Sequence, residues 1–369
     1  MNARLIFCAA GIVSLSVMSF AGIYSGGLGT ETNPYQISTV GDWQELANAP
    51  ADWDAWFILT ANIDLAGVSL ATVGNNNTRF TGVFDGNRHV VENLTMNTPD
   101  QDFVGLFGYV GALGKVKNLG VVNVNIYGRE AVGGLAGRSH GTILACYAEG
   151  AVNGGGWDVG GLVGSNIGGA IKGCYAAVNV ISITNYVGGL VGYNLGDSIV
   201  SSYAAGAVSG AEYVGGLLGA NDKGQVVDCY STGAAAGTSS VGGLVGVNWD
   251  GSIVGCFWDT QTSGTIVSGG GIGKTTAEMK TQTLYADAGW DFDQVWASFQ
   301  GGHYPHLQWQ LLAADFVMPE GVGLEDFSLL SRNWLRQECG DCEGVDLDGD
   351  SIVALSDLLS FSDQWLGGR

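Results

Sequence analysis

Basic residues are scarce in this chain. Its 369 residues include 14 Lys and Arg against 35 Asp and Glu, which gives a formal net charge of −21. A protein that binds nucleic acid needs a basic face, so this charge balance argues against that class of function. Long apolar runs are also missing. Outside residues 5–18, no stretch is apolar enough to cross a membrane.

The N-terminal residues predict a secretory leader. Arg4 supplies a positive charge, residues 5–18 are apolar, and Ser19 and Ala21 are small residues at the positions that a signal peptidase recognises. The apolar run is shorter than the roughly 20 residues that a membrane span requires. We therefore expect residues 1–21 to be a signal peptide, the mature chain to be secreted to the extracellular space or the cell surface, and no membrane span to remain after cleavage.

The middle of the chain has no stretch long enough for a helix between Gly or Asn residues, because its apolar runs are only 3–5 residues long. Six segments there open with nearly the same letters, V-G-G-L-V-G, at intervals of 27 or 28 residues. They begin at Val104, Val132, Val159, Val187, Val214 and Val241. Such a fixed period predicts a stack of repeated units. Three short strands per unit describe one coil of a parallel β-helix, and we expect it to be right-handed.

Equivalent positions of the units predict columns of like side chains. They are a small-residue column (Cys146, Cys174, Ser202, Cys229, Cys256), an aromatic column (Tyr147, Tyr175, Tyr203, Tyr230, Phe257), a leucine column (Leu135, Leu162, Leu190, Leu217, Leu244) and an Asn column (Asn166, Asn194, Asn221, Asn248). Stacked Asn amides can hydrogen-bond one another along a column. The cysteines can be buried as small hydrophobes or paired as disulfides, and the serine at position 202 favours burial.

The centre of each unit is Gly-Leu-hydrophobic-Gly, as at residues 134–137 and 161–164. This pattern resembles the bacterial GLUG motif family over about residues 104–258, and the resemblance implies a secreted or surface β-solenoid. GLUG repeats also accompany a zinc peptidase domain in some bacterial immunoglobulin-cleaving proteins. This sequence contains no H-E-x-x-H motif, so the resemblance does not carry that activity over.

Residues 22–103 and 259–310 flank the repeats. We expect the first segment to form an N-terminal cap with the first coils and the second to form a C-terminal cap, because an open solenoid end exposes unpaired backbone. A short helix is predicted at residues 41–48, and a capping box is predicted at residues 275–278. Five aromatic residues of the second segment are expected to plug the solenoid end, with stacking on sugars as the alternative: Trp290, Phe292, Trp296, Tyr304 and Trp309.

The last segment, residues 311–369, is acidic, with 12 acidic and 3 basic residues. Within it, residues 346–357 carry carboxylates at positions 1, 3, 5 and 12 of a 12-residue loop. At this spacing the side-chain oxygens converge on one Ca²⁺ ion, and the backbone carbonyl of position 7 adds a ligand. The sequence therefore predicts one calcium site. Its ligands are Asp346, Asp348, Asp350, Ile352 and Asp357.

Helices are predicted at residues 326–335 and 357–366, each with one apolar face. This duplicated loop–helix, over about residues 313–368, resembles a type I dockerin, the calcium module that binds a cohesin domain. The first loop departs from the pattern because Val317 and Pro319 replace its two central ligands, so we expect one bound ion. The resemblance implies contact with a cohesin-like partner through loop positions 10 and 11. In this sequence they are Leu324, Glu325, Leu355 and Ser356.

The predicted chain is thus an all-β parallel solenoid at residues 104–258, between two caps, with a small all-α, dockerin-like domain at residues 311–369. The charged residues of the coils do not recur at one register. We therefore expect a non-enzymatic adhesion or structural protein that is anchored through its tail, with an extracellular polysaccharide as a further partner. The alternative is a polysaccharide-degrading lyase or hydrolase, whose site would need two or more carboxylates close together on one face.

Overall fold

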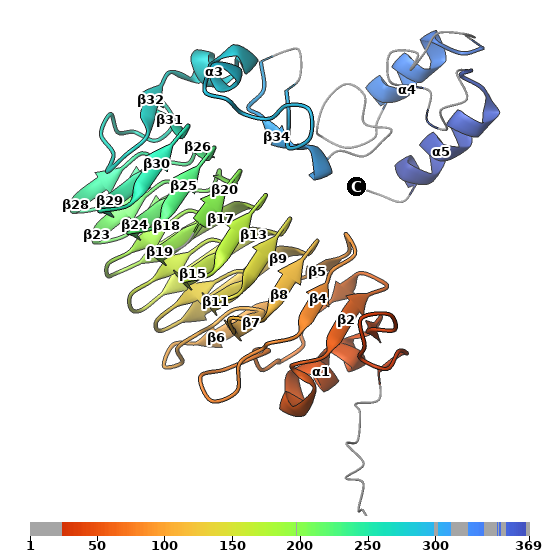
Figure 1. Ribbon diagram of the computed structural model, residues 1–369, viewed down its shortest axis with the longest axis horizontal. Helices are drawn as coiled ribbons and strands as arrows, with labels where there is room; N and C mark the ends of the chain where they lie inside the picture. The colour runs from red at the N-terminus through yellow and green to blue at the C-terminus, as the bar shows by residue number, and fades with distance from the viewer. Residues whose placement is uncertain are drawn as a thin grey trace, which may run out of the picture.

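The computed structural model describes residues 24–196, 198–298, 302–310, 324–335, 345, 347 and 352–366. The predicted signal peptide lies outside these residues. Most of the described chain forms a stack of coils along which four parallel sheets run (Figure 1). The predicted parallel β-solenoid is therefore confirmed. None of the helices in the described part of the chain is long and apolar enough to span a membrane.

The full coils contribute strands to four sheets, whereas the sequence predicted three strands per coil. The coil at residues 159–182 consists of β14 (Val159–Gly160), β15 (Val163–Ile167), β16 (Ala170–Lys172) and β17 (Tyr175–Ser182). The additional break comes at the Gly-Gly-Leu step, where the chain bends between β14 and β15. A Cβ atom added to Gly161 would lie 2.1 Å from the carbonyl oxygen of Gly189 in the next coil, so a side chain does not fit there.

Equivalent strands of successive coils pair in parallel and build four sheets. Sheet I contains β1 (Tyr35–Ile37), β2 (Trp56–Leu59), β4 (Val83–Asp85), β8 (Lys115–Lys117), β12 (Thr142–Leu144), β16, β20 (Ser198–Val200), β25 (Gln225–Val227) and β30 (Ser252–Val254). Sheet II contains β10 (Val132–Gly133), β14, β18 (Val187–Gly188), β23 (Glu212–Gly215) and β28 (Ser239–Gly242).

Sheets III and IV complete the coils. Sheet III contains β7 (Phe107–Val110), β11 (Ala136–Ser139), β15, β19 (Val191–Leu195), β24 (Leu218–Asp222) and β29 (Val245–Trp249). Sheet IV contains β3 (Ile63–Asp64), β5 (Val90–Glu92), β6 (Thr95–Thr98), β9 (Gly120–Gly128), β13 (Tyr147–Gly154), β17, β21 (Tyr203–Ala204), β22 (Val208–Ser209), β26 (Tyr230–Ser231), β27 (Ala235–Ala236), β31 (Phe257–Asp259) and β32 (Ile272–Lys274).

Helix α1 (Val40–Asn48) covers the N-terminal end of the stack, where a helix was predicted (Figure 1). Thr39 and Asp42 form a capping box: the Thr39 hydroxyl accepts from the backbone N–H of Asp42 at 3.1 Å, and the Asp42 carboxylate accepts from the backbone N–H of Thr39 at 2.9 Å. Trp43 is fully buried, with its ring 5.2 Å from that of Phe84 in the solenoid core. A single turn, η1 (Pro50–Asp52), follows.

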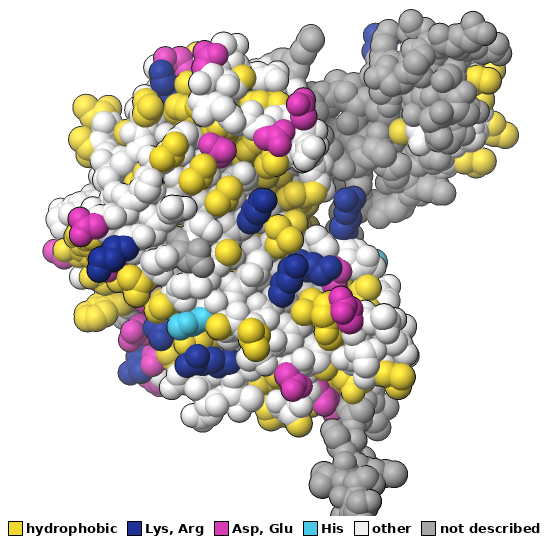
Figure 2. All heavy atoms as spheres, in the orientation of Figure 1, with side chains coloured by type: hydrophobic (Ala, Val, Ile, Leu, Met, Phe, Trp, Pro, Cys, Tyr) yellow, Lys and Arg dark blue, Asp and Glu magenta, His cyan; other side chains and the backbone are white. Residues whose placement is uncertain are grey.

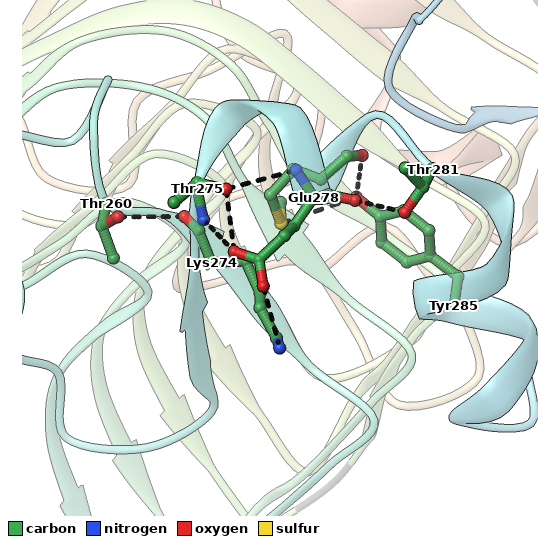
Figure 3. A network of polar contacts seen from close by, with 7 residues as sticks. Thr260, Lys274, Thr275, Glu278, Thr281 and Tyr285 are labelled. Carbon is green, nitrogen blue, oxygen red and sulfur yellow. Dashed lines mark hydrogen bonds and ion pairs between the residues drawn. The ribbon is translucent and has the colours of Figure 1, made fainter.

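The C-terminal end of the stack is closed by a partial coil. The Ser268 hydroxyl accepts from the backbone N–H of Val245 at 2.9 Å, and β32 pairs with β31. Helices α2 (Thr276–Met279) and α3 (Gln282–Asp287) follow. Figure 3 shows the predicted capping box at the start of α2, in which Thr275 and Glu278 bond reciprocally and Lys274 lies 3.5 Å from the Glu278 carboxylate. The contacts of Ser268 and of β32 thus cover part of the open edge of the last coil.

The predicted aromatic column is confirmed. The rings of Tyr147, Tyr175, Tyr203 and Tyr230 stack with centroid separations of 4.8, 5.0 and 4.8 Å and interplanar angles below 10°. These rings point away from the solenoid core, and they form a second apolar cluster with the segment that follows the last coil.

The aromatic residues at positions 290–309 do not plug the solenoid end as we expected. They lie along its side, over the tyrosine column. Trp309 packs 6.0 Å from the ring of Tyr175 and donates its indole N–H to the carbonyl oxygen of Gly173 at 2.9 Å, which places it several coils from the end. Strands β33 (Trp296–Ala297) and β34 (His306–Leu307) and the turn η2 (Gln308–Gln310) belong to this covering segment.

The Asn column is confirmed as a buried hydrogen-bonded ladder. Asn166 donates its amide N–H to the side-chain oxygen of Asn194 at 2.7 Å, and the next two steps along the column are 2.8 Å each. The cysteines of the neighbouring column are free thiols, with exposed fractions of 0–2 %. Burial, the first of the two alternatives, is therefore the correct one. Removal from water raises the pKa of the Cys174 thiol to about 12, which keeps it protonated and unreactive.

We predict that Asn194→Ala destabilises the solenoid by about 1–3 kcal/mol, because the buried Asn166 amide loses one of its two acceptors and keeps only the Gly169 carbonyl, while the buried side-chain oxygen of Asn221 loses its donor. Thermal or urea unfolding measures this effect. Asn76→Ala is the matched control, since Asn76 is exposed in a loop. Equal stability of the two variants would show that the ladder contributes nothing.

Candidate ligand-binding surface

One corner of each coil holds a residue in the left-handed backbone region. The position immediately before the V-G-G-L letters has φ between 50° and 63° in six successive coils. Its occupants, here called the corner column, are Phe103, Ala131, Asp158, Tyr186, Tyr213 and Ser240. This conformation costs a bulky residue of the order of 1–3 kcal/mol, and such strain tends to collect at functional sites. Two tyrosines in the column are therefore a reason to examine this surface.

These two tyrosines belong to a row of aromatic side chains that crosses several coils. The aromatic strip, as we call it, consists of Trp157, Tyr186, Tyr193, Tyr213 and Trp249. Tyr186 and Tyr213 stack at 5.2 Å with planes 10° apart. Tyr193, on β19, lies 5.5 Å from Tyr186, and Trp249, at the end of β29, lies edge-on 5.5 Å from Tyr213. Trp157 extends the row by an edge contact of 6.3 Å with Tyr186.

The aromatic strip is open to solvent, unlike the covered tyrosine column. The exposed fractions of Trp157 and Trp249 are 54 % and 36 %, and the three tyrosines are half-buried. A contiguous exposed apolar surface of this kind marks an interaction site. Aromatic rings that are held by their neighbours also lose little conformational entropy when a ligand binds. The face of the molecule in Figure 2 shows charged side chains in small separated groups among uncharged ones.

Two acidic residues border the strip at Tyr193. The Tyr193 hydroxyl donates to the Asp222 carboxylate at 3.0 Å. Burial and this hydrogen bond raise the pKa of Tyr193 to about 12, with a smaller contribution from the negative charge of Asp158. Asp158 itself is buried at the corner, and loss of water raises the pKa of its carboxyl to about 6, although the positive charge of Arg138 acts in the opposite direction. Asp158 therefore exchanges a proton near neutral pH.

A second surface feature lies on sheet IV. A hollow of about 540 Å³ opens over β6, β9, β13 and β17 and is lined largely by uncharged polar side chains. Its amides come from Asn97, Asn125 and Asn153, and its one aromatic ring belongs to Tyr127, which is 39 % exposed. The hollow therefore offers less stacking surface than the strip.

The predicted calcium loop lies only partly within the described residues. Asp346, Asp348 and Asp350 lie outside them. Asp357 is fully buried, and its two carboxylate oxygens accept from the backbone N–H groups of Leu347 at 2.6 Å and of Ala354 at 2.8 Å. These bonds hold the backbone of Leu347 and of Ala354 against Asp357. The backbone of Ile352 lies in the same turn, next to the buried Val353.

The helices on either side of this loop meet through their apolar faces. They are α4 (Leu324–Arg332) and α5 (Leu355–Leu366), and each begins two residues earlier than predicted. Leu330 and Phe361 are fully buried, and the ring of Phe327 lies 5.8 Å from that of Phe361. A hollow of about 320 Å³ borders this contact, between Phe327 and Trp334.

The four predicted partner-binding residues stand at the starts of these helices. Leu355 is 62 % exposed and Ser356 is also exposed at the first turn of α5. Leu324 and Glu325 occupy the equivalent first turn of α4, and their side chains lie outside the described part of the chain. The two pairs thus occupy matching positions in the two helices.

The aromatic strip was not predicted from the sequence, because the predicted columns consist of positions that stay constant between units. The strip occupies positions that vary. The sequence did contain a signal, because Tyr186 and Tyr213 occupy the same position, immediately before V-G-G-L, in two consecutive units. The strand register shows which of the remaining aromatic residues join them, since β19 and β29 are separated by β24 alone.

Comparison with known proteins supports the repeats and the fold. The model of the GLUG motif matches residues 155–181, 183–209 and 210–235, so the chain carries GLUG repeats. Over 152 residues, 38 % of the chain, the sequence is 37 % identical to halomucin from Haloquadratum walsbyi. Over 129 residues, 33 % of the chain, it is 32 % identical to a "Putative Gly-rich membrane protein" from Evansella cellulosilytica. The chain spans 2 % and 15 % of the lengths of these two relatives.

A solved structure shares the fold. It is the crystal structure of a "putative immunoglobulin A1 protease" from Bacteroides ovatus, which superimposes with a TM-score of 0.55 over 78 % of this chain and 95 % of that chain. The two sequences are 23 % identical. At this identity the likeness shows the fold alone.

We predict that Asp158→Asn stabilises the protein at neutral pH but not at pH 4. The folded pKa of about 6 lies above the ordinary value of 3.8, so the fold favours the protonated form. That contribution is complete at low pH and is lost as the pH rises through 6. It amounts to at most about 3 kcal/mol. Asparagine is also tolerated in the left-handed region.

Unfolding midpoints of the wild type and the variant at pH 4 and pH 7.5 measure this effect, and their difference should grow with pH. Asp250→Asn is the control, because Asp250 has φ 56° but is exposed. If the unfolding midpoints of Asp158→Asn and the wild type differ by the same amount at both pH values, the raised pKa of Asp158 is contradicted.

Proposed function

We propose that this chain is a secreted, non-enzymatic β-solenoid that adheres to extracellular polysaccharide through the aromatic strip and is anchored by its C-terminal helix pair. The similarity to halomucin and to a Gly-rich membrane protein supports a place at or outside the cell surface. The solenoid provides a rigid, regular surface, on which side chains from successive coils stand about 4.8 Å apart.

The strip is the observation that carries the adhesive function. Its five rings follow the solenoid axis from coil to coil, so it matches a long, narrow ligand better than a small molecule. Aromatic faces offer apolar contact to the carbon–hydrogen faces of sugar rings, while the hydroxyl of Tyr193 and the carboxylate of Asp222 provide polar partners at one side. Tyr and Trp are also the residues most often found as binding hot spots.

The anchoring part of the proposal depends on the tail. The buried Asp357 carboxylate and the carboxylates of Asp346, Asp348 and Asp350 supply the oxygen ligands that Ca²⁺ prefers. One calcium ion would fix the start of α5, and with it Leu355 and Ser356. The exposed apolar side chain of Leu355 could then dock onto a cohesin-like domain.

A polysaccharide-degrading enzyme is the competing function, and one observation favours it. The Tyr193 hydroxyl donates to Asp222, and the charge of Asp158, a carboxyl whose pKa burial raises to about 6, also acts on Tyr193. Two carboxyl groups on one face can act as acid and base in glycoside hydrolysis. Release of reducing sugars from a polysaccharide panel by the wild type, and its loss in Asp158→Asn, would establish this activity in place of adhesion.

The adhesive function is tested with Tyr186→Asn plus Tyr213→Asn on a glycan array and by affinity electrophoresis in polysaccharide gels. Asparagine is favoured over tyrosine in the left-handed region, so the variant should fold while lacking the centre of the strip. We expect binding of at least one polysaccharide by the wild type and a loss of about tenfold or more in the variant.

Tyr127→Asn is the matched control, because it removes an exposed tyrosine from the hollow on sheet IV. Binding that is lost in Tyr127→Asn and kept in the strip variant would move the site to that hollow. Absence of binding to every polysaccharide would contradict the adhesive function.

Calorimetric titration with calcium tests the anchor. We expect uptake of one ion per chain, and we expect Asp348→Ala plus Asp350→Ala to abolish it, because two of the converging oxygens are removed. Asp315→Ala, in the first loop that lacks its central ligands, should leave uptake unchanged. No uptake by the wild type, or full uptake by the double variant, would refute the calcium site.

A further inference from the structure

An arginine column stands on the outer side of sheet III, at its N-terminal end. Arg138 on β11 pairs in register with Tyr109 on β7. Phe80 forms a bridge with Val110, so the preceding Arg79 lies beside Tyr109 in the coil below. Three successive coils therefore place arginine, tyrosine and arginine in one row outside the solenoid core, with Tyr109 only 3 % exposed beneath the two arginines.

Both guanidinium groups converge on the same ring. The guanidinium carbon of Arg79 lies 4.5 Å from the centroid of Tyr109, and that of Arg138 lies 5.9 Å from it. Arg138 also lies 4.5 Å above the ring of Phe103, the first member of the corner column. Cation–π contacts hold each arginine flat against the surface, while the two positive charges, brought over one ring, repel each other.

No acidic side chain forms an ion pair with either arginine among the described residues, although the charge of Arg138 acts at longer range on the Asp158 carboxyl. Among the described residues, neither Arg79 nor Arg138 forms an ion pair or a hydrogen bond, and the Nε atom of Arg138 is buried without a partner. The nearby carboxylate of Asp102 is already paired with Arg129 at 2.7 Å. The remaining N–H groups of the two guanidinium groups have no acceptor in the described part of the chain, so they are available to the oxygens of a bound anion.

The neighbouring histidine reports the same positive environment. His140, on the same side of the sheet, is joined through Nε2 to the Tyr109 hydroxyl at 2.7 Å. Burial lowers the pKa of His140, and the charges of Arg79 and Arg138 lower it further. The carboxylate of Asp158 feels the charge of Arg138 without forming an ion pair with it. It limits the positive region toward the next coil.

We propose that Arg79, Tyr109 and Arg138 form a binding site for the anionic group, a carboxylate or a sulfate, of an acidic polysaccharide. The site shares the outer face of sheet III with the aromatic strip, so one extended chain could meet both, and in this respect the inference rests on the proposed adhesive function. Arginine suits the role because its planar fork matches the oxygens of carboxylate and sulfate. The site would thus select acidic polymers.

The net charge of the whole chain makes binding of an acidic polymer a strict test of this site. This charge of −21 repels polyanions, so tight binding of one requires a local positive site. Dextran, carboxymethyl dextran and dextran sulfate share one backbone and differ in their charged groups. We expect the full-length protein to bind at least one of the charged polymers about tenfold more tightly than dextran. The stronger of the two identifies carboxylate or sulfate as the anion.

Arg79→Gln plus Arg138→Gln should abolish this preference. Lys172→Gln plus Lys223→Gln is the matched control, because it removes the same charge from exposed positions away from the site and should keep the preference. Arg79→Lys plus Arg138→Lys, which keeps the charge but not the planar fork, should keep part of it. If the Arg138→Gln change prevents folding, Arg79→Gln alone, at an exposed position, should still weaken binding severalfold.

Two results would overturn the site. One is equal affinity of the wild type for all three polymers. The other is that the lysine control loses the preference for charged polymers as completely as the arginine variant does, because the preference would then depend on net charge and not on this site. The strip variant separates this inference from the adhesive function. If Tyr186→Asn plus Tyr213→Asn still prefers the charged polymers, the arginine site is supported and the adhesive role of the strip is not. If binding is lost in this variant and the wild type binds charged and uncharged polymers equally, only the adhesive function remains.

Discussion

The parallel hydrogen bonds between successive coils are the constraint on which the rest of the structure depends. They fix each residue above its equivalent one coil away, as in the pairs Tyr147–Tyr175 and Val159–Val187. The coils can approach closely at the Gly-Gly-Leu step only because Gly161 has no side chain. Once the register is set, the buried Asn ladder, the cysteine column and the stacked tyrosines all follow from it.

The same register also orders residues that differ from unit to unit. At the corner column, the left-handed backbone is imposed on each coil, while the side chain is free to vary from alanine to tyrosine. Variable positions therefore become rows on the surface, such as the aromatic strip and the arginine column. The tyrosine column has the opposite role, because residues 276–298 and 302–310 cover it and make it part of the apolar interior. Whether a row binds a ligand thus depends on what lies over it.

The sequence was sufficient for features that repeat. The period, the columns and the helix at residues 40–48 could be predicted because local pattern and register determine them. The fourth strand of each coil was missed because the Gly-Gly-Leu bend is set by contact with the next coil. Trp309 packs on Gly173, which is 136 residues away in the sequence, and this contact could not be predicted from the local sequence around either residue. The strip and the arginine column were missed for a related reason, since they arise from positions without a common letter. In the tail, Asp357 is described but Asp346, Asp348 and Asp350 are not, so the calcium loop stays a prediction.

Distances between spin labels at equivalent positions of different coils test the register most directly. Thr142, Gln225 and Ser252 occupy one outward position of sheet I, on β12, β25 and β30. With other accessible thiols removed, labels at 142 and 225 should be separated by three coil spacings, about 14 Å, and labels at 142 and 252 by four, about 19 Å. A step of about 5 Å between the two pairs is the predicted result. Distances that fail to increase with the number of coils would contradict the account.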